Sequence, residues 1–476
     1  MPTTLVLFDR DLRLCDHAPL HHAAARGTVV PVLIWWPDDE GDWPMGAAQR
    51  AWLAQSLPRF EATLRERGSR LIVRNRPTRE ALAELLDETG ADALYWHRRY
   101  TPAGRSLDAA MLDFARERGI KTEVFDGRIL HDPTALCTGA GEPYKVYTPF
   151  GKALVQHTEV PPPLSQPKTL PAPKAWPASE LNALVDALTP SPRWDAGFWD
   201  AWTPGEDSAL ARLDAFVRAD GDRTGLDRYD DERDRPDRDG SSRLSPHLAL
   251  GEVSIRTVWH AAQGSSTGRT KFRNELLWRE FAYHLLWHFP TTTTEPLKPS
   301  FARIPWRDAP NDLDAWKRGQ TGFPYLDAAL RQLWATGWMH NRARMAVGGF
   351  LVKHLLLPWQ DGARWFWDTL VDADLANNTL GWQWVTGSGA DAAPYFRVLN
   401  PMLQGEKFDP DARYTQAFVP ELRRLAPKHA LAPWDAPPDA LRRAGVALGQ
   451  TYPHRIVDAA AARHRALAAY ERTKTA

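Results

Sequence analysis

Apolar residues in the first 130 positions fall into five short runs, separated by longer stretches of helical character. The runs occupy residues 4–8, 28–36, 70–74, 92–96 and 121–125. Each is short and rich in branched or aromatic side chains, as is typical of strands buried on both faces of a parallel sheet. Stretches rich in Ala, Leu, Glu and Arg lie between them, at residues 46–66, 78–89 and 104–118. Strands that alternate with helices predict a doubly wound parallel sheet with right-handed crossovers.

The pattern changes twice beyond residue 130. Residues 131–205 include proline-dense stretches without a periodic pattern, which predicts a surface connector rather than a domain. From 206 to 476 the pattern is helical, with stops at Pro and Gly and no convincing strand. We therefore predict an α/β domain over 1–130, a connector over 131–205 and an all-helical domain over 206–476. No GxGxxG motif follows the first strand, so a Rossmann dinucleotide site is not indicated there.

Composition and charge narrow the function classes. The formal net charge is zero, so nucleic-acid binding would require a local patch of cations on a neutral protein. The two cysteines, Cys15 and Cys137, form neither a disulfide framework nor a metal-ligand pattern, and we expect no metal site. The chain has no apolar run of about 18 residues and no signal-peptide pattern, so we expect a cytoplasmic protein without membrane contact. We also expect a monomer.

A helix predicted around WMHNRARM at 338–345 has a face of mixed chemistry. Trp338, Asn341, Arg342 and Met345 follow one another at three- and four-residue steps, which places them on the same side of a helix. A core-facing side would exclude Asn and Arg, and a solvent-facing side would exclude Trp and Met. The mixture suits a pocket for a flat, amphiphilic ligand such as a pair of nucleobases.

The stretch NELLWREF at 274–281 is more ambiguous. Glu275, Trp278 and Arg279 share one helix face at the spacing of side-chain neighbours. These eight residues alone favour the simpler interpretation, a surface Glu–Arg pair beside a packed indole. The serine-rich stretch at 240–252 is similar in this respect, because hydroxyls and free N–H groups at a helix start can bind an anion but more often form only a cap.

Two stretches carry a more specific resemblance. Residues 338–345 and residues 375–401, which read LANNTLGWQWVTGSGADAAPYFRVLNP, resemble the flavin- and lesion-binding core of the DNA photolyase and cryptochrome family. They look most like the class I photolyases that split cyclobutane pyrimidine dimers. The resemblance extends over nearly the whole chain, from FDRDLRL at 8–14 to GEKFD at 405–409.

The resemblance implies non-covalent FAD in the helical domain. The matching flavin contacts are Tyr229, Ser241, Ser242, Leu244, Ser245, Arg279, Trp338, Arg344, Asp372, Asp374 and Asn378. Asn378 matches the position that faces flavin N5, and Arg344 with Asp372 is expected to form an ion pair near the flavin. Trp382, Trp359 and Trp306 match the tryptophan chain that reduces the photoexcited flavin. With 22 tryptophans in the chain, any one of them alone would be read as core packing.

The resemblance also implies a pocket for a dimer flipped out of DNA, the partner of this family. The residues that match its lining are Glu275, Trp278, Asn341, Arg342, Met345 and Trp384. Arg342 is expected to hold a backbone phosphate, with Arg397 and Lys407 as further cations of one rim. The implied activity is light-driven repair of cyclobutane dimers by a carbon–carbon lyase, with electron transfer from excited reduced FAD. Glu275, Asn378 and the three tryptophans are the residues expected to act in it.

Departures from the family pattern leave some points open. The Asn-Glu pair that holds a folate antenna in one subgroup is replaced by Ala103-Gly104, so the presence and identity of a second chromophore stay open. Enzymes that repair the six-four photoproduct usually carry histidines at the places of Asn341 and Met345, which argues against that substrate. The alternative function is a cryptochrome-type photosensor, or a single-strand-specific member with little repair activity. Asn378 and the lack of a long C-terminal tail favour repair.

Overall fold

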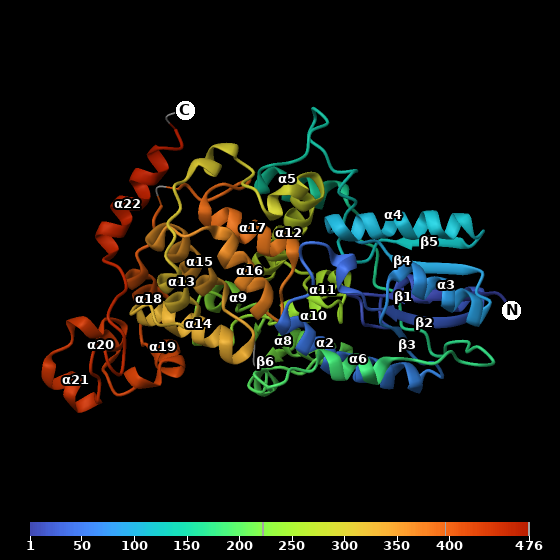
Figure 1. The fold of residues 1–476 in the computed structure, drawn as a ribbon, viewed down its shortest axis with the longest axis horizontal. Helices are drawn as coiled ribbons and strands as arrows, with labels where there is room; N and C mark the ends of the chain where they lie inside the picture. Colours follow the sequence, from blue (N-terminus) through green and yellow to red (C-terminus); the bar gives the residue numbers. More distant parts are fainter. Residues whose placement is uncertain (221–222, 396, 475–476) are drawn as a thin grey trace. The chain divides into compact units, whose positions relative to one another are not determined.

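The structure is a computed structural model that describes residues 1–220, 223–395 and 397–474 (Figure 1). The chain forms two compact units. The first unit comprises Met1–Asp227, Ser242–Pro290 and Val371–Ala376. The second unit comprises Arg228–Ser241, Thr291–Leu370 and Asn377–Ala476. Because the chain passes repeatedly from one unit to the other, residues close together in the sequence can belong to different units.

The first unit is built on a five-stranded parallel sheet with the strand order β3-β2-β1-β4-β5. The strands are β1 (Thr3–Phe8), β2 (Thr28–Ile34), β3 (Ile72–Arg74), β4 (Ala93–His97) and β5 (Lys121–Phe125). The register between β1 and β2 runs from Thr3 opposite Thr28 to Phe8 opposite Leu33. The doubly wound parallel sheet predicted from the five apolar runs is therefore confirmed.

Helices between these strands cover the sheet. They are α1 (Ala18–Arg26), α2 (Ala47–Glu66), α3 (Thr78–Thr89) and α4 (Pro102–Glu117), with the 3-10 turn η1 (Pro37–Glu40) before α2. Leu82 and Leu85 of α3 and Phe114 of α4 pack with β-strand residues such as Val32 and Trp96 in one buried cluster. The apolar sides of α3 and α4 thus pack on the sheet, as the alternating pattern predicted.

The remaining segments of the first unit are helical or extended. They include α5 (Tyr147–His157), α6 (Leu181–Leu188), α7 (Phe198–Ala201), α8 (Glu206–Val217), α10 (Ser245–Ala249), α11 (Ile255–Ala261) and α12 (Thr267–His288). The proline-dense chain is tied along the sheet by backbone hydrogen bonds, such as Val29 N to Pro171 O at 2.8 Å. A short antiparallel pair, β6 (Ala219–Asp220) with β7 (Arg223–Thr224), contradicts the prediction of no strand beyond 206. Two-residue strands are too short to leave a periodic pattern.

The second unit is mainly helical in the part of the chain that the structure describes. Its longer elements are α13 (Pro310–Lys317), α14 (Pro324–Thr336), α15 (Asn341–Gly349), α16 (Trp359–Thr369), α18 (Pro401–Phe408) and α22 (Ala459–Glu471). Its shorter helices are α9 (Tyr229–Glu232), α19 (Arg413–Phe418), α20 (Pro427–Leu431) and α21 (Pro438–Ala444). The 3-10 turns are η2 (Pro290–Thr293), η3 (Pro299–Arg303), η5 (Pro420–Leu422) and η6 (Pro433–Asp435). Helix α17 (Leu375–Thr386) begins in the first unit and continues into the second.

A π-helical turn distinguishes the second unit. Helix α15 runs directly into η4 (Phe350–Leu355), a π-helix that ends at Leu356 with a φ of 55°. The C-terminal helix α22 packs on this turn, where an Arg465 amino group donates to the His354 carbonyl at 2.6 Å. Such wide turns often occur at functional sites. Among the described residues, no helix is both long and apolar enough to cross a bilayer.

Candidate functional site

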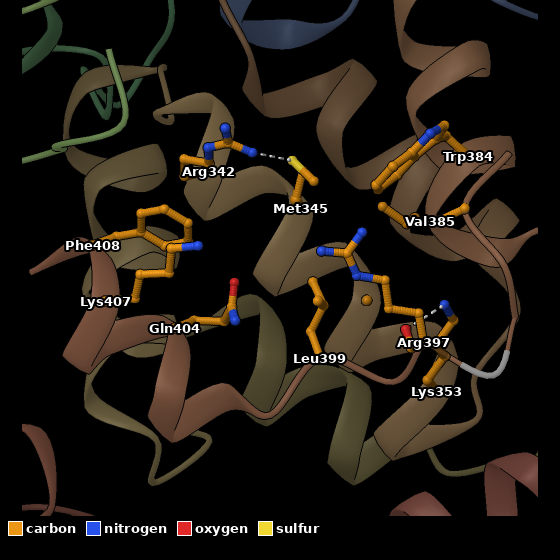
Figure 2. Close-up of a pocket in the computed structure, with 12 residues that line it drawn as sticks. Arg342, Met345, Lys353, Trp384, Val385, Arg397, Leu399, Gln404, Lys407 and Phe408 are labelled. Atoms are coloured by element: carbon orange, nitrogen blue, oxygen red, sulfur yellow. Dashed lines mark hydrogen bonds between the residues drawn. The ribbon is translucent and has the colours of Figure 1, made fainter. Parts of the chain in front are cut away.

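A cavity of about 250 Å³ opens in the second unit (Figure 2). Its lining consists of Arg342, Met345, Gly349, Lys353, Trp384, Val385, Ala393, Arg397, Leu399, Gln404, Lys407 and Phe408. Four of these residues are cationic and none is acidic, although the chain as a whole is neutral. The wall thus combines a local excess of positive charge with an indole, a thioether and aliphatic side chains. This composition fits a flat apolar group attached to an anion.

One wall of the cavity is a continuous helical face. Arg342 and Met345 from α15 are followed by Gly349 and by Lys353 from the π-helix, at steps of three or four residues. The predicted sharing of one helix face by Arg342 and Met345 is confirmed.

The same prediction was wrong for Trp338. Helix α15 begins only at Asn341, because the imidazole of His340 acts as the N-cap and accepts from Arg342 N at 3.2 Å. Trp338 is therefore buried ahead of the helix, in an edge-on contact with His340. Asn341 is exposed and does not line this cavity. The roles expected for both residues stay predictions.

Arg342 is already held by a carboxylate. Its Nε and Nη2 groups donate to Asp234 Oδ1 at 2.7 Å and Oδ2 at 2.9 Å. Its Nη1 group lies 3.7 Å from Met345 Sδ, and its guanidinium lies over the Phe408 ring at 5.4 Å. Partial burial alone would raise the pKa of Asp234, but the hydrogen bonds and charge of Arg342 hold this pKa below its usual value. Asp234 was not singled out from the sequence, so this pair was missed.

The same helical wall ends at a buried lysine. Lys353 is only 3% exposed, and its Nζ donates to the Arg397 carbonyl at 3.3 Å while lying 5.3 Å from the Tyr395 ring centre. Tyr395 in turn stacks on Tyr470 of α22, with ring centres 4.5 Å apart. Burial, assisted by the positive charge of Arg397, lowers the pKa of Lys353 to about 8. Lys353 was also missed from the sequence, because FLVKHL reads as an ordinary amphipathic turn.

The two tryptophans of GWQW have different surroundings. Trp384 of α17 is half-buried and lines the cavity, as predicted. Trp382 is buried against α16, where a Cβ added to Gly362 would lie 2.1 Å from its ring. Phe366 meets the Trp382 ring edge-on at 5.1 Å. Gly362 is therefore required for the close packing of this indole.

The other members of the predicted electron path lie in the same unit. Trp359 begins α16 and is buried, whereas Trp306 is partly exposed beside Phe301 and Ile304. An arrangement from buried to partly exposed indoles suits a path to the surface. The electron-transfer role of the three tryptophans stays a prediction.

Asn378 supplies a test of whether the residues fit a reduced flavin. Its Nδ2 donates to the Ala363 carbonyl at 3.0 Å. Because a carbonyl can only accept, this contact fixes the amide so that Oδ1 points away and can accept a further hydrogen bond. A neutral acceptor suits a protonated ring nitrogen and tolerates a nearby anion, so Asn378 fits the cofactor implied by the resemblance. An aspartate here would face the Ala363 carbonyl with a negative charge.

Other expected flavin contacts belong to a buried polar network of the first unit. Asp374 accepts from the Tyr283 hydroxyl and lies 3.8 Å from Arg128 Nη2. Arg279 donates to the Arg128 carbonyl at 2.9 Å and lies over the Tyr283 ring. Burial opposes the charge of Arg128, but the neighbouring Tyr283 and Asp374 raise its pKa above the usual value. Arg128 was not singled out from the sequence, because no motif surrounds it.

The serine-rich stretch forms a tight turn before α10. Ser242 Oγ accepts from Leu244 N at 3.3 Å, and Arg243 has a left-handed φ of 51°. Ser245 is the first residue of α10. The stretch is divided between units, since Ser241 belongs to the second and its successors to the first. Tyr229, also in the second unit, is buried beneath the Arg233 guanidinium.

The first unit places Trp278 and Glu275 on α12. Tyr147 of α5 stacks face to face on Trp278, with ring centres 3.8 Å apart and planes 7° from parallel. The Tyr147 hydroxyl donates to the Asn274 carbonyl at 3.0 Å, and burial together with the charge of Glu275 raises its pKa above the usual value. One face of the Trp278 indole is therefore already covered. Tyr147 lies far from α12 in the sequence, so helix spacing could not identify it.

Comparison with known proteins gives concordant results for both halves of the chain. A family described as "DNA photolyase" matches residues 4–173, and one described as "FAD binding domain of DNA photolyase" matches residues 272–472. The chain is 48% identical over 476 residues to a deoxyribodipyrimidine photo-lyase of Agrobacterium fabrum, covering 99% of this chain and 98% of that relative. It is 36% identical to cryptochrome-2 of Arabidopsis thaliana, covering 99% of this chain and 79% of the relative.

A solved structure agrees with the sequence relatives. The crystal structure of a class III photolyase from Agrobacterium tumefaciens superposes with a TM-score of 0.95 at 47% identity, covering 100% of this chain and 98% of that one. The particular resemblance to class I members is not confirmed, since this similar structure carries a different class label.

Proposed function

Because the chain belongs to the DNA photolyase and cryptochrome family, we propose that it uses light to split cyclobutane pyrimidine dimers in DNA. FAD is its cofactor, and its photo-lyase relatives identify it as a lyase. The observation that carries the proposal is the cavity lined by four cations, an indole and a thioether without any carboxylate. A dimer extruded from DNA combines two apolar rings with a phosphate backbone, and each part finds a partner in this lining.

The cavity residues divide the binding between rings and backbone. Trp384 and Met345 offer an aromatic face and a polarisable side chain to the dimer rings. Arg397 and Lys407 are exposed at the rim, where cations contact phosphates and position the strand. Extrusion of the dimer requires unstacking, which costs less for a damaged pair than for an intact one. The shape and apolar lining of the cavity therefore favour an extruded dimer, whereas its positive charge attracts any DNA.

Trp278 and Glu275 are proposed to complete the recognition of the dimer. Because Tyr147 covers one face of Trp278, only the opposite face can stack on a pyrimidine ring. The Glu275 carboxyl can accept from an imide N–H and, when protonated, donate to a ring carbonyl. A donor aimed at the carbonyl where negative charge develops lowers the barrier to ring opening. Glu275→Ala is therefore expected to lower repair per photon more than it lowers binding.

When bound and reduced, FAD supplies the photoexcited electron for the reaction. Asn378 would accept a hydrogen bond from the ring nitrogen through its side-chain oxygen, because Ala363 holds its amide in that orientation. We assign Trp382, Trp359 and Trp306 to the inward electron path that restores the reduced state. The remaining flavin contacts follow the resemblance residue by residue. A second chromophore is left open, because Ala103 and Gly104 cannot supply the polar side chains of a folate site.

A photosensor is the competing function, and the match to a plant cryptochrome over nearly the whole chain favours it. The two functions are separated by illuminating the flavin-loaded, reduced protein with a defined dimer-containing oligonucleotide, as duplex and as single strand. Recovery of intact pyrimidines in the light, and none in the dark, is the expected result. A protein that binds FAD but restores neither substrate would leave the photosensor as the better assignment.

A further inference from the structure

The Asp234–Arg342 pair has a geometry that leaves part of Arg342 available. A guanidinium presents five N–H donors in a planar fork. Asp234 occupies the side formed by Nε and Nη2, with contacts of 2.7 and 2.9 Å. The end of the fork, formed by Nη1 and the second hydrogen of Nη2, can still bind another bidentate acceptor such as a phosphate. Its Nη1 lies along the cavity wall beside Met345, as Figure 2 shows.

A second contact fixes the segment that carries Asp234. The imidazole of His340 accepts from Arg342 N and also hydrogen bonds to the backbone of Arg233. Since one ring nitrogen accepts, the other carries the proton and donates to the Arg233 carbonyl. The start of α15 is thus joined to residues 233–234 by a side-chain pair and by a bridging ring. These contacts therefore hold the Arg342 side chain in one orientation, so it can bind only a phosphate that lies at the matching position.

Asp234 also changes the charge of the cavity rim. Within the described part of the chain, Lys353, Arg397 and Lys407 show no carboxylate partner, whereas Arg342 has a bidentate one. Each cation that contacts a phosphate contributes to the sequence-independent attraction for all DNA. A carboxylate at this single cation reduces that general attraction while preserving the orientation of the fork.

We propose that Asp234 is a specificity-determining residue, which holds Arg342 for the phosphate of an extruded dinucleotide and weakens binding to intact duplex. The inference rests on the proposed function, because it presupposes that dimer-containing DNA enters this cavity. Asp234 acts through Arg342 and is a positioning residue. It was not among the residues that the family resemblance assigned.

The test compares Asp234→Asn with the native protein on two DNA duplexes that differ only by one cyclobutane dimer. Asparagine keeps the shape of the side chain but removes its charge and one acceptor. Affinity for intact duplex should rise, with a salt slope steeper by about 0.9, because one more cation contacts phosphate. Affinity for dimer DNA should fall, so that discrimination drops by about tenfold, the usual scale for a lost charged hydrogen bond.

Asp411→Asn is the matched control. Asp411 is also half-exposed and pairs with an arginine of the same segment, Arg235, at 3.2 Å, but neither residue lines the cavity. The same change of charge should leave discrimination unaltered. Asp234→Glu should preserve most of the discrimination, and Asp234→Asn should have little further effect in an Arg342→Gln background. Flavin absorbance and the thermal midpoint show whether each variant is folded.

The outcomes distinguish a failure of the proposed function from a failure of the role of Asp234 alone. Native protein that binds both duplexes equally contradicts the proposed function and this inference together. Native discrimination that survives Asp234→Asn contradicts the role of Asp234 alone. Equal losses in Asp234→Asn and Asp411→Asn would also overturn it, since a general charge effect would then explain both.

Discussion

The buried polar cluster around Asp11 in the first unit contrasts with the cavity of the second. Asp11 Oδ2 receives hydrogen bonds from His17 Nε2 at 3.1 Å and His97 Nδ1 at 2.7 Å, and its Oδ1 accepts from Asp9 N at 2.8 Å. The charge of Asp11 is therefore satisfied from within the protein. Three of the four cavity cations lack such a partner among the described residues. Compensated charge supports the fold, whereas uncompensated charge indicates where a ligand supplies the counter-charge.

The Asp11 cluster could be mistaken for a metal site, because it brings two imidazoles and a carboxylate together. Its hydrogen bonds argue otherwise. The Nδ1 atom of His17 accepts from Leu20 N at 3.1 Å, so its Nε2 must carry the proton directed at Asp11. A metal would need the lone pair of that nitrogen. The cluster is better explained as a structural link between the start of α1 and the end of β4.

The largest expected effect concerns stability in acid, to which buried histidines of both units contribute. Burial lowers the pKa of His97 and His284 in the first unit to about 3, and of His340 and His354 in the second to about 4. Unfolded histidines bind protons near pH 6.5, before the folded ones do, so stability falls as pH drops from 6.5 towards 4. Each histidine contributes up to about 1.4 kcal/mol per pH unit. Urea unfolding at several pH values checks this, and a flat profile over that range would contradict the neutral buried state.

Asp11→Ala should be the most damaging single substitution of this set. It removes the acceptor of two buried imidazole N–H groups and should lower the free energy of unfolding by about 3 kcal/mol. Asp9→Ala is the control, since Asp9 is half-exposed and pairs with Arg99 at 3.1 Å, an interaction worth less than about 1 kcal/mol. Chemical unfolding of both variants measures the difference. Similar losses of unfolding free energy in both variants would mean that the buried Asp11 contributes no more to stability than the exposed Asp9.

Lys353→Met should cost little stability, because it removes a buried cation that no carboxylate of the described residues compensates. Stability should change by less than about 1 kcal/mol, since the lost carbonyl contact is offset by a relieved desolvation penalty. DNA affinity should fall by about tenfold through the displaced Arg397. In the native protein the same loss should appear as pH rises through about 8, where Lys353 becomes neutral. Affinity titrations from pH 7 to 9 test this, and Lys353→Met should remove the pH dependence.

The smallest effect is expected at Tyr147. Tyr147→Leu removes the ring that backs Trp278 and should weaken dimer binding several-fold, because stacking is worth about 1–3 kcal/mol per base and depends on the indole orientation. Tyr147→Phe loses only the hydroxyl bond to the Asn274 carbonyl and should bind nearly as well as native protein. Equilibrium binding to the dimer oligonucleotide separates the two. Equal affinity in both variants would show that Trp278 needs no support.

Periodicity predicted the sheet well, because parallel strands such as β1 and β4 are buried on both faces and leave continuous apolar runs. It predicted α3 at 78–89 with the observed bounds. It failed at Trp338, since a histidine rarely caps a helix and His340 gives no recognisable start. The π-helical turn at 350–355 also leaves no pattern, because the extra residue per turn depends on packing against α22.

The site residues likewise fall into those that local sequence patterns identify and those that only the tertiary fold reveals. Local spacing and motif resemblance identified Arg342, Met345 and Trp384, because each of these signals lies within a single helix. Asp234 and Tyr147 act across more than 100 residues of sequence, Asp234 on Arg342 and Tyr147 on Trp278. Contacts of that range depend on the tertiary fold, and a single sequence carries no pattern for them. Partners of site residues are therefore the part that a structure adds.

The stack of Tyr470 on Tyr395 has a consequence for how the protein is made. Tyr395 lies under Lys353, which holds the Arg397 carbonyl, so the cavity wall is supported by α22. Ribosomes release the N-terminal part first, and domains fold as they emerge. The sheet of the first unit can form early, whereas the cationic wall lacks its support until α22 has left the exit tunnel. Binding competence is therefore acquired only after α22 has been made, so a nascent chain that lacks this helix cannot occupy damaged DNA unproductively.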